Sequence, residues 1–266
     1  MRRVLAMAAT AIAFASAIGV QSVSAQAAGA TSAEEIIKSS RDRIKADTVS
    51  TRSRMVIVAK DGSTTERLVD QYSSDKDGPS KTVVVFQKPA SVAGTRFLTI
   101  DNVGKDDDRW IFLPALGKVR RIAASEGSGS FMGTDLSYDD VSSADRAVGE
   151  DDHRLLREEA LDGKDSWVIE STPKDSGYQY SKMVSWIEKS TRIALKIELY
   201  DRKGGLVKVL EILKAEDKQG RLTPTVTRMS TVKAKTSTTI NVEIVKYDDP
   251  IPASVFTTKY LETGRP

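Results

Sequence analysis

The residue types that most often carry enzymatic chemistry are scarce in this chain. His153 is its only histidine, and it contains no cysteine. No segment matches the Gly-x-Ser-x-Gly pattern of a serine hydrolase, and zinc would find at most one nitrogen ligand and no thiolate. His153 follows Asp151 and Asp152 in a charged run, which is typical of a solvated surface histidine. The pattern favours a binding protein over an enzyme.

Two further kinds of chemical site lack support in the sequence. Asp106, Asp107 and Asp108 form an acidic cluster, but their spacing differs from that of a calcium-binding loop, so we expect a surface turn. No phosphate-binding loop or dinucleotide fingerprint occurs. The sequence therefore predicts neither a metal nor a cofactor.

The N-terminus has the order of regions found in a secretory signal peptide. Arg2 and Arg3 precede an apolar run that ends near Val20, and small residues follow at Val23-Ser24-Ala25. The alternative is a membrane anchor, but the run is short and rich in alanine for a membrane span. The sequence predicts a signal peptide over 1–25, location in the periplasm, and a soluble single domain over 26–266.

Composition limits the partners of the mature chain. Cleavage after Ala25 removes two of the 40 Lys and Arg residues, which leaves 38 basic residues against 37 acidic ones. A net charge of +1 argues against a nucleic-acid partner. Because the periplasm is oxidising and the chain has no cysteine, the fold depends on burial without disulfides.

One helix and a long series of strands are expected to position any site. Ser32 and Glu35 form a capping box, and apolar residues continue at helical spacing to Ile44. Strand patterns separated by short turns such as Asp61-Gly62 predict an antiparallel meander. The expected strands cover residues 48–59, 64–72, 81–87, 94–101, 108–113, 118–123, 153–161, 166–172, 182–188, 192–200, 206–217, 223–232 and 238–245.

Several of these strands are apolar on both faces, as in Val83 to Phe86, Phe97 to Ile100, Trp110 to Leu113 and Met183 to Ile187. A sheet of eleven or so strands with such a pattern needs cover on both sides, and one long helix is hardly enough. Either the core is packed throughout, or the sheet encloses an apolar cavity.

Residues Ser125 to Ala147 interrupt the strand pattern. Phe131 and Met132 form an apolar tip between a flexible stretch and an acidic one, in which a short helix is expected from Ser137. A long irregular insertion of this kind is usually functional or disordered. Because these two side chains are costly to leave in water, we expect the tip to dock on the rest of the protein.

Two segments carry a resemblance to a known family. They are Trp110 to Ile122, with Leu113-Pro114 and Arg120-Arg121-Ile122, and Ser130 to Val141, with Phe131-Met132-Gly133. They resemble the bacterial outer-membrane lipoprotein-sorting protein family, which is similar in fold to the lipoprotein carriers LolA and LolB. Thr134 stands where that family usually has Ser. Lesser matches lie at Phe86 to Ala90, Gly94 to Leu98, Ile251-Pro252, Phe256-Thr257 and Tyr260 to Glu262.

The resemblance implies a mainly β fold with a few helices. It would be an incomplete antiparallel β-barrel, a curved sheet whose concave side is covered by helices, with an apolar cavity between them. It also implies binding of lipid or lipoprotein acyl chains in the periplasm, by a monomer, beside an inner-membrane exporter of the resistance-nodulation-division type. Because a fold hosts many functions, the resemblance alone leaves the function open.

Our hypothesis at this stage is a carrier with a cavity lined by aromatic side chains. Phe131 and Met132 would form a movable lid, and either Arg120 or Arg121 would meet a head group at the mouth. Each aromatic has ordinary core packing as its alternative, and each arginine an ion pair with Asp135, Asp139 or Asp140. The expected ligand-binding residues are Phe86, Phe97, Trp110, Phe112, Arg120, Arg121, Phe131, Met132, Trp167 and Trp186.

Two rival functions fit the same sequence. A non-catalytic adaptor or sensor would bind a peptide or the exporter through an exposed apolar groove. An enzyme acting on lipid or envelope polymer would need a deep pocket with a serine or a carboxylate pair near His153.

Overall fold

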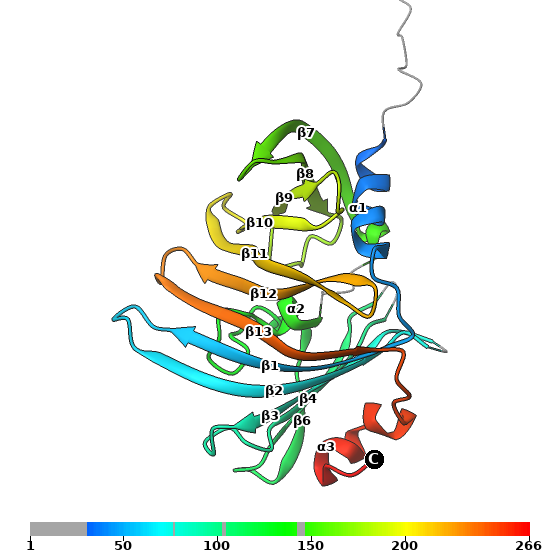
Figure 1. Cartoon of the computed structure of the whole chain (residues 1–266). Coiled ribbons are helices and arrows are strands. Elements are labelled where there is room, and N and C mark those ends of the chain that lie inside the picture. Colours follow the sequence, from blue (N-terminus) through cyan, green and yellow to red (C-terminus); the bar gives the residue numbers. More distant parts are fainter. Residues whose placement is uncertain (1–30, 77, 103–104, 143–146) are drawn as a thin grey trace, which may run out of the picture. The chain divides into compact units, whose positions relative to one another are not determined.

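The computed structural model describes residues 31–76, 78–102, 105–142 and 147–266. The predicted signal peptide over 1–25 lies outside these residues. Within them, no helix is long and apolar enough to cross a bilayer. They form a single curved antiparallel sheet of thirteen strands that does not close, with three short α-helices (Figure 1). The predicted mainly β fold is confirmed.

All thirteen expected strands form. They are β1 (Thr48–Val58), β2 (Thr64–Ser74), β3 (Lys81–Lys88), β4 (Arg96–Ile100), β5 (Asp108–Leu113), β6 (Lys118–Arg121), β7 (Asp151–Leu161), β8 (Lys164–Pro173), β9 (Lys182–Glu188), β10 (Ala194–Tyr200), β11 (Leu206–Lys218), β12 (Arg221–Thr231) and β13 (Thr236–Tyr247). The turn between β7 and β8 shows why an Asp-Gly pair in the sequence predicts a hairpin. Asp162 and Gly163 both have positive φ (49° and 78°), as a tight hairpin requires.

Helix α1 (Ala33–Asp42) begins with the predicted capping box. The Glu35 amide donates to Ser32 Oγ, and the Ser32 amide donates to Glu35 Oε2. Its buried residues Ile36 and Ile37 pack against Ile169 of β8 and Ile187 of β9. The helix ends at Asp42, before the predicted Ile44, so Ile44 lies in the following loop.

The order of strands requires a long connection between the two edges of the sheet. It runs β6-β5-β4-β3-β2-β1-β13-β12-β11-β10-β9-β8-β7, so β6 and β7 are the two edges. The chain between Arg121 and Asp151 therefore has to pass from one edge to the other. Its described part includes the short helices η1 (Ala124–Glu126), α2 (Tyr138–Ser142) and η3 (Val148–Glu150). We call residues 124–142 the strap.

Strand register assigns each side chain to one of two faces, because directly paired residues point the same way. Val84 pairs with Phe97 and Phe97 with Ile111, which places them on the face that carries the strap. This is the inner, concave face; α2 lies within the curve of the sheet in Figure 1. Val83, Leu98 and Trp110 share the outer face.

The outer face is covered by the C-terminal end of the chain. Helices η4 (Ala253–Phe256) and α3 (Thr258–Thr263) place Val255, Phe256 and Leu261 against Val83 and Leu98. Two apolar layers thus enclose β3 to β5, which accounts for strands that are apolar on both faces.

Candidate functional site

The strap fills one half of the inner face with aromatic side chains. Phe131 is fully buried, and its ring centroid lies 5.6 Å from that of Phe86 and 5.2 Å from that of Phe97. Tyr138 closes the group, 5.5 Å from Phe131 and 5.7 Å from Phe97. These offset and edge-to-face contacts are favourable geometries for aromatic pairs. The Phe131 tip therefore docks on the sheet, as predicted, and its side chain is part of the core.

Met132 follows Phe131 at the rim of this cluster and is partly buried. Its φ is 53°, and its carbonyl accepts a hydrogen bond from Arg67 of β2. The backbone of the tip is thus fastened to the sheet. The predicted movable lid is in this structure a packed part of the core.

Three buried or partly buried aspartates anchor the strap across the sheet. Asp135 Oδ2 accepts a hydrogen bond from the Thr238 hydroxyl at 2.8 Å, and Oδ1 accepts from Thr231 at 2.6 Å and from Thr236. Asp139 pairs with Arg109 of β5 at 2.6 Å. The strap is thus anchored to β5 and, several strands away in the sheet, to β13 and β12.

Asp140 provides the third anchor, at the far side. It accepts from Lys208 Nζ of β11 at 2.6 Å, from the Tyr180 hydroxyl at 2.8 Å and from Gln179 at 3.2 Å. Burial raises the pKa of the Tyr180 phenol, so it stays a neutral donor. The sequence showed this stretch as acidic, but only the fold reveals that each carboxylate meets a different strand.

The predicted aromatic residues fall on two faces. Trp110 and Phe112 lie on the outer face, where they pack against the cluster covered by η4 and α3. Trp186 pairs in register with Val168 and also lies on the outer face. One cavity lined by all six predicted aromatics is therefore wrong, because strand alternation sends Phe86, Phe97 and Trp167 to the opposite side.

Trp167 is the predicted aromatic nearest to α1. It packs beside the cluster formed by Ile36, Ile37 and their partners, and the Arg192 guanidinium lies 4.4 Å from its ring centroid. Trp186 has a cation too, with Lys196 Nζ 4.2 Å from its ring centroid. Both side chains are thus engaged by the protein itself.

Arg120 and Arg121 do alternate across β6, as predicted, but neither pairs with the strap aspartates. Arg120 shares the face of Ile111 and pairs with Glu126 at 2.7 Å, whereas Arg121 shares the face of Trp110 and pairs with Asp108. Arg109 makes the contact with Asp139 instead. The alternative to head-group binding, an ion pair of Arg120 or Arg121 with Asp135, Asp139 or Asp140, is therefore wrong, because both arginines have other partners.

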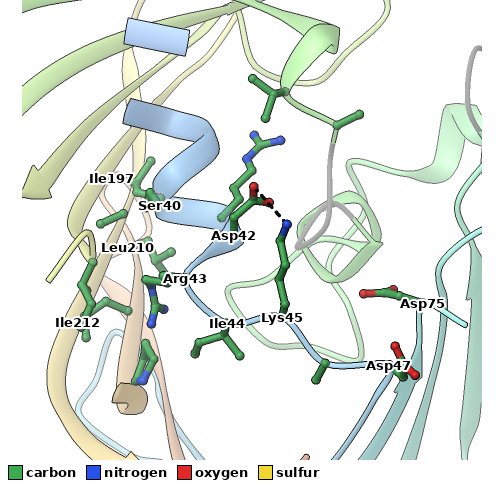
Figure 2. Close-up of a pocket in the computed structure, with 17 residues that line it drawn as sticks. Ser40, Asp42, Arg43, Ile44, Lys45, Asp47, Asp75, Ile197, Leu210 and Ile212 are labelled. Carbon is green, nitrogen blue, oxygen red and sulfur yellow. Dashed lines mark ion pairs between the residues drawn. The ribbon is translucent and has the colours of Figure 1, made fainter. Parts of the chain in front are cut away.

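A pocket of about 680 Å³ occupies the other half of the inner face, between the end of α1 and strands β10 to β12 (Figure 2). This volume falls within the range of small-molecule sites, about 300–1,000 Å³. None of the ten predicted side chains lines it. Its lining residues are Ser40, Arg41, Asp42, Arg43, Ile44, Lys45, Ala46, Asp47, Asp75, Ala147, Val148, Ile193, Ala194, Ile197, Leu210, Ile212 and Pro224.

The pocket wall is apolar on the sheet side. Ile197 of β10 pairs with Leu210 of β11, so both side chains project from the inner face, and Ile212 follows two residues later on the same face. Ile44 approaches from the loop after α1. Ile44 was predicted as the last apolar residue of the helix, and the alternation of Leu195, Ile197 and Leu199 in β10 is the sequence pattern that could have indicated this wall.

His153 is placed differently from the prediction. It is partly buried, with Nδ1 2.8 Å from Ser171 Oγ and Nε2 3.0 Å from the Val148 carbonyl oxygen. Because β7 is paired with β8, the histidine is held by its neighbour strand and by η3. No cluster of three metal-ligating side chains occurs in the part of the chain that the structure describes.

Glu159 of β7 offers a test of the outer-face geometry. Hydrogen bonds from Arg157, at 2.8 and 2.9 Å, and from Trp186 Nε1, at 2.6 Å, lower the pKa of Glu159 to about 2. Because the folded pKa is depressed, the stabilisation is present above the unfolded value near 4.5 and is lost as the pH falls through about 2. With Trp110 and Trp167 replaced by Phe, we expect Trp186 fluorescence to titrate near pH 2.

The control for this titration is Arg157→Gln, which removes the strongest contact and should move the midpoint up towards 4.5. A wild-type midpoint already near 4.5 would contradict the hydrogen-bonded arrangement of Glu159 and Trp186.

Comparisons with known proteins agree with this architecture. A DUF1329 family protein from Desulfovibrio piger is 32% identical, with 86% of this chain and 97% of that chain covered and a TM-score of 0.82. A domain assigned to an outer membrane lipoprotein-sorting protein from Vibrio parahaemolyticus is 28% identical, with 86% and 98% covered and a TM-score of 0.81. A LolA superfamily protein from Nitrosomonas europaea, 23% identical, shares the fold, with 87% and 100% covered and a TM-score of 0.71.

A search of the curated proteins gives no match. A family model described as an uncharacterized protein family matches residues 78–263, which include the strap, the outer-face cover and the sheet side of the pocket. The chain has the LolA-like fold and, as this match and the 32% identical relative show, it belongs to the DUF1329 family.

Proposed function

We propose that the protein is a non-catalytic periplasmic carrier. It binds a lipid, a lipoprotein acyl chain or another hydrophobic cargo in the inner-face pocket and passes it towards the outer membrane. The observation that carries this proposal is the pocket of about 680 Å³ with its wall of Ile197, Leu210 and Ile212. The lipoprotein-sorting assignment of the Vibrio relative supports it.

Apolar burial would supply the affinity. Each methylene that leaves water contributes about 0.8 kcal/mol before the cost of ordering the chain. The pocket lies at the end of α1, so an acyl chain can contact both the helix and the sheet. The aromatic half of the inner face is already filled by Phe131 and contributes no space for cargo.

Replacing Ile212 by arginine tests the pocket directly. The larger cationic side chain should occupy the apolar wall and lower the uptake of a fluorescent fatty acid at least tenfold, measured by fluorescence titration of the purified mature protein. Leu116→Arg is the matched control, because Leu116 is 61% exposed in the turn after β5. It should leave uptake unchanged.

Lipid mass spectrometry of the protein purified from its native envelope identifies the cargo. A stoichiometric lipid that is absent from folded Ile212→Arg supports the carrier. A protein that comes out empty and takes up no fluorescent fatty acid contradicts it. That result would favour the adaptor that partners an inner-membrane exporter.

A further inference from the structure

Arg43 is a cation of the pocket lining that has no carboxylate partner among the described residues. Arg43 follows α1, is partly buried, and lines the pocket. One guanidinium nitrogen, Nη1, donates to the Leu222 carbonyl oxygen at 2.7 Å. No carboxylate in the part of the chain that the structure describes lies within ion-pair distance of Arg43. Within the same residues Arg67, Arg96 and Arg192 also lack such a partner, but they do not line the pocket.

Lys45, Asp42 and Asp75 of the pocket lining have partners within the protein. Lys45 Nζ lies 3.4 Å from Asp42, which also pairs with Lys38. Asp75 accepts a hydrogen bond from Ser80 at 2.6 Å. In Figure 2, Asp47 and Asp75 lie on the side of the pocket away from Arg43. Asp47 and Asp75 thus lie opposite Arg43, and Asp42, the acidic residue beside Arg43 in the chain, is paired with Lys38 and Lys45.

Arg43 is also next to the apolar wall. Figure 2 shows its side chain beside Leu210 and Ile212. Desolvation lowers the pKa of Arg43, because burial disfavours the charged form of the guanidinium. A guanidinium has five donors in a planar fork that suits carboxylate or phosphate oxygens, and only one of them has a hydrogen bond here.

We propose that the pocket takes an anionic amphiphile, whose oxyanion head group is bound by Arg43 and whose acyl chain lies on Ile197, Leu210 and Ile212. This inference rests on the proposed function, since it names the class of cargo for the same pocket. The shared chemistry is an oxyanion on a single chain, a carboxylate or a phosphate ester.

The experiment compares three ligands that have the same chain: myristate, tetradecyl phosphate and tetradecanol. Each displaces the neutral dye Nile red from the mature protein. The wild type should bind one or both anions at least tenfold more tightly than the alcohol, as expected for charge-assisted hydrogen bonds in a partly buried site. Arg43→Gln should lose that preference and keep its affinity for tetradecanol, whereas Arg43→Lys should retain part of it.

Arg154→Gln is the matched control, since Arg154 lies outside the pocket, is exposed and is paired with Glu170. A larger loss for tetradecyl phosphate than for myristate in Arg43→Gln identifies a phosphate head group, and the reverse identifies a carboxylate. Equal binding of all three ligands by the wild type, or an equal loss in Arg154→Gln, overturns the role of Arg43 and leaves the carrier standing. Failure of the wild type to bind any of the three overturns the carrier itself.

Discussion

Replacement of Phe131 by alanine should lower the free energy of unfolding by about 3–5 kcal/mol, as truncation of a buried Phe does when its site cannot collapse. Phe131 is fully buried against Phe86, Phe97 and Tyr138. Its neighbours are fixed by the register of β3 and β4, so a cavity would remain. Urea denaturation followed by circular dichroism measures the change.

Leu116→Ala is the control, because Leu116 is exposed and should change stability by less than about 0.5 kcal/mol. The result also decides between two roles of the strap. A lid that opens readily would lose little when Phe131 is truncated. A loss below about 1 kcal/mol would therefore contradict the fixed core position that the structure gives to this side chain.

Replacement of Lys208 by methionine should cost about 3–5 kcal/mol, because it leaves the carboxylate of Asp140 buried without a cation. The Lys208 side chain is 15% exposed and that of Asp140 is 6% exposed. The hydrogen bonds from Tyr180 and Gln179 remain, but they do not supply a counter-charge.

The double variant Lys208→Met with Asp140→Asn should lose less than Lys208→Met alone, because a neutral amide needs no cation. Lys214→Met is the control on the same strand. Its ion pair with Glu216 is exposed, so removal should cost less than about 1 kcal/mol. If the Lys208 and Lys214 variants were equally stable, the strap would not depend on the Asp140 anchor.

Local patterns in the sequence predicted the elements because each depends on neighbours in the chain. Alternation and short turns located all thirteen strands, and Ser32 with Glu35 located the start of α1. The end of α1 was placed too late, because Ile44 continues the helical spacing but contacts the pocket from a loop. An apolar residue satisfies either arrangement, so spacing alone cannot distinguish them.

The site was less predictable, because it depends on register between distant strands. An aromatic residue on a two-faced strand gives no sign of which face will be concave, and Trp110 and Phe97 were therefore grouped although they lie on opposite sides. The anchors of Asp135 lie about a hundred residues away in sequence. Arg43 is one of 40 basic residues in the sequence, and only the structure shows that it lines the pocket.

The pairing of β1 with β13 has a consequence for how the protein is made. It brings Val49 beside Tyr247, so the centre of the sheet is completed only when the last strand is available. Until β13 pairs with it, β1 is an edge strand of the partly folded sheet, and charged side chains discourage aggregation at such edges. Arg52 and Arg54 place two cations on β1, although the same strand is central in the finished sheet.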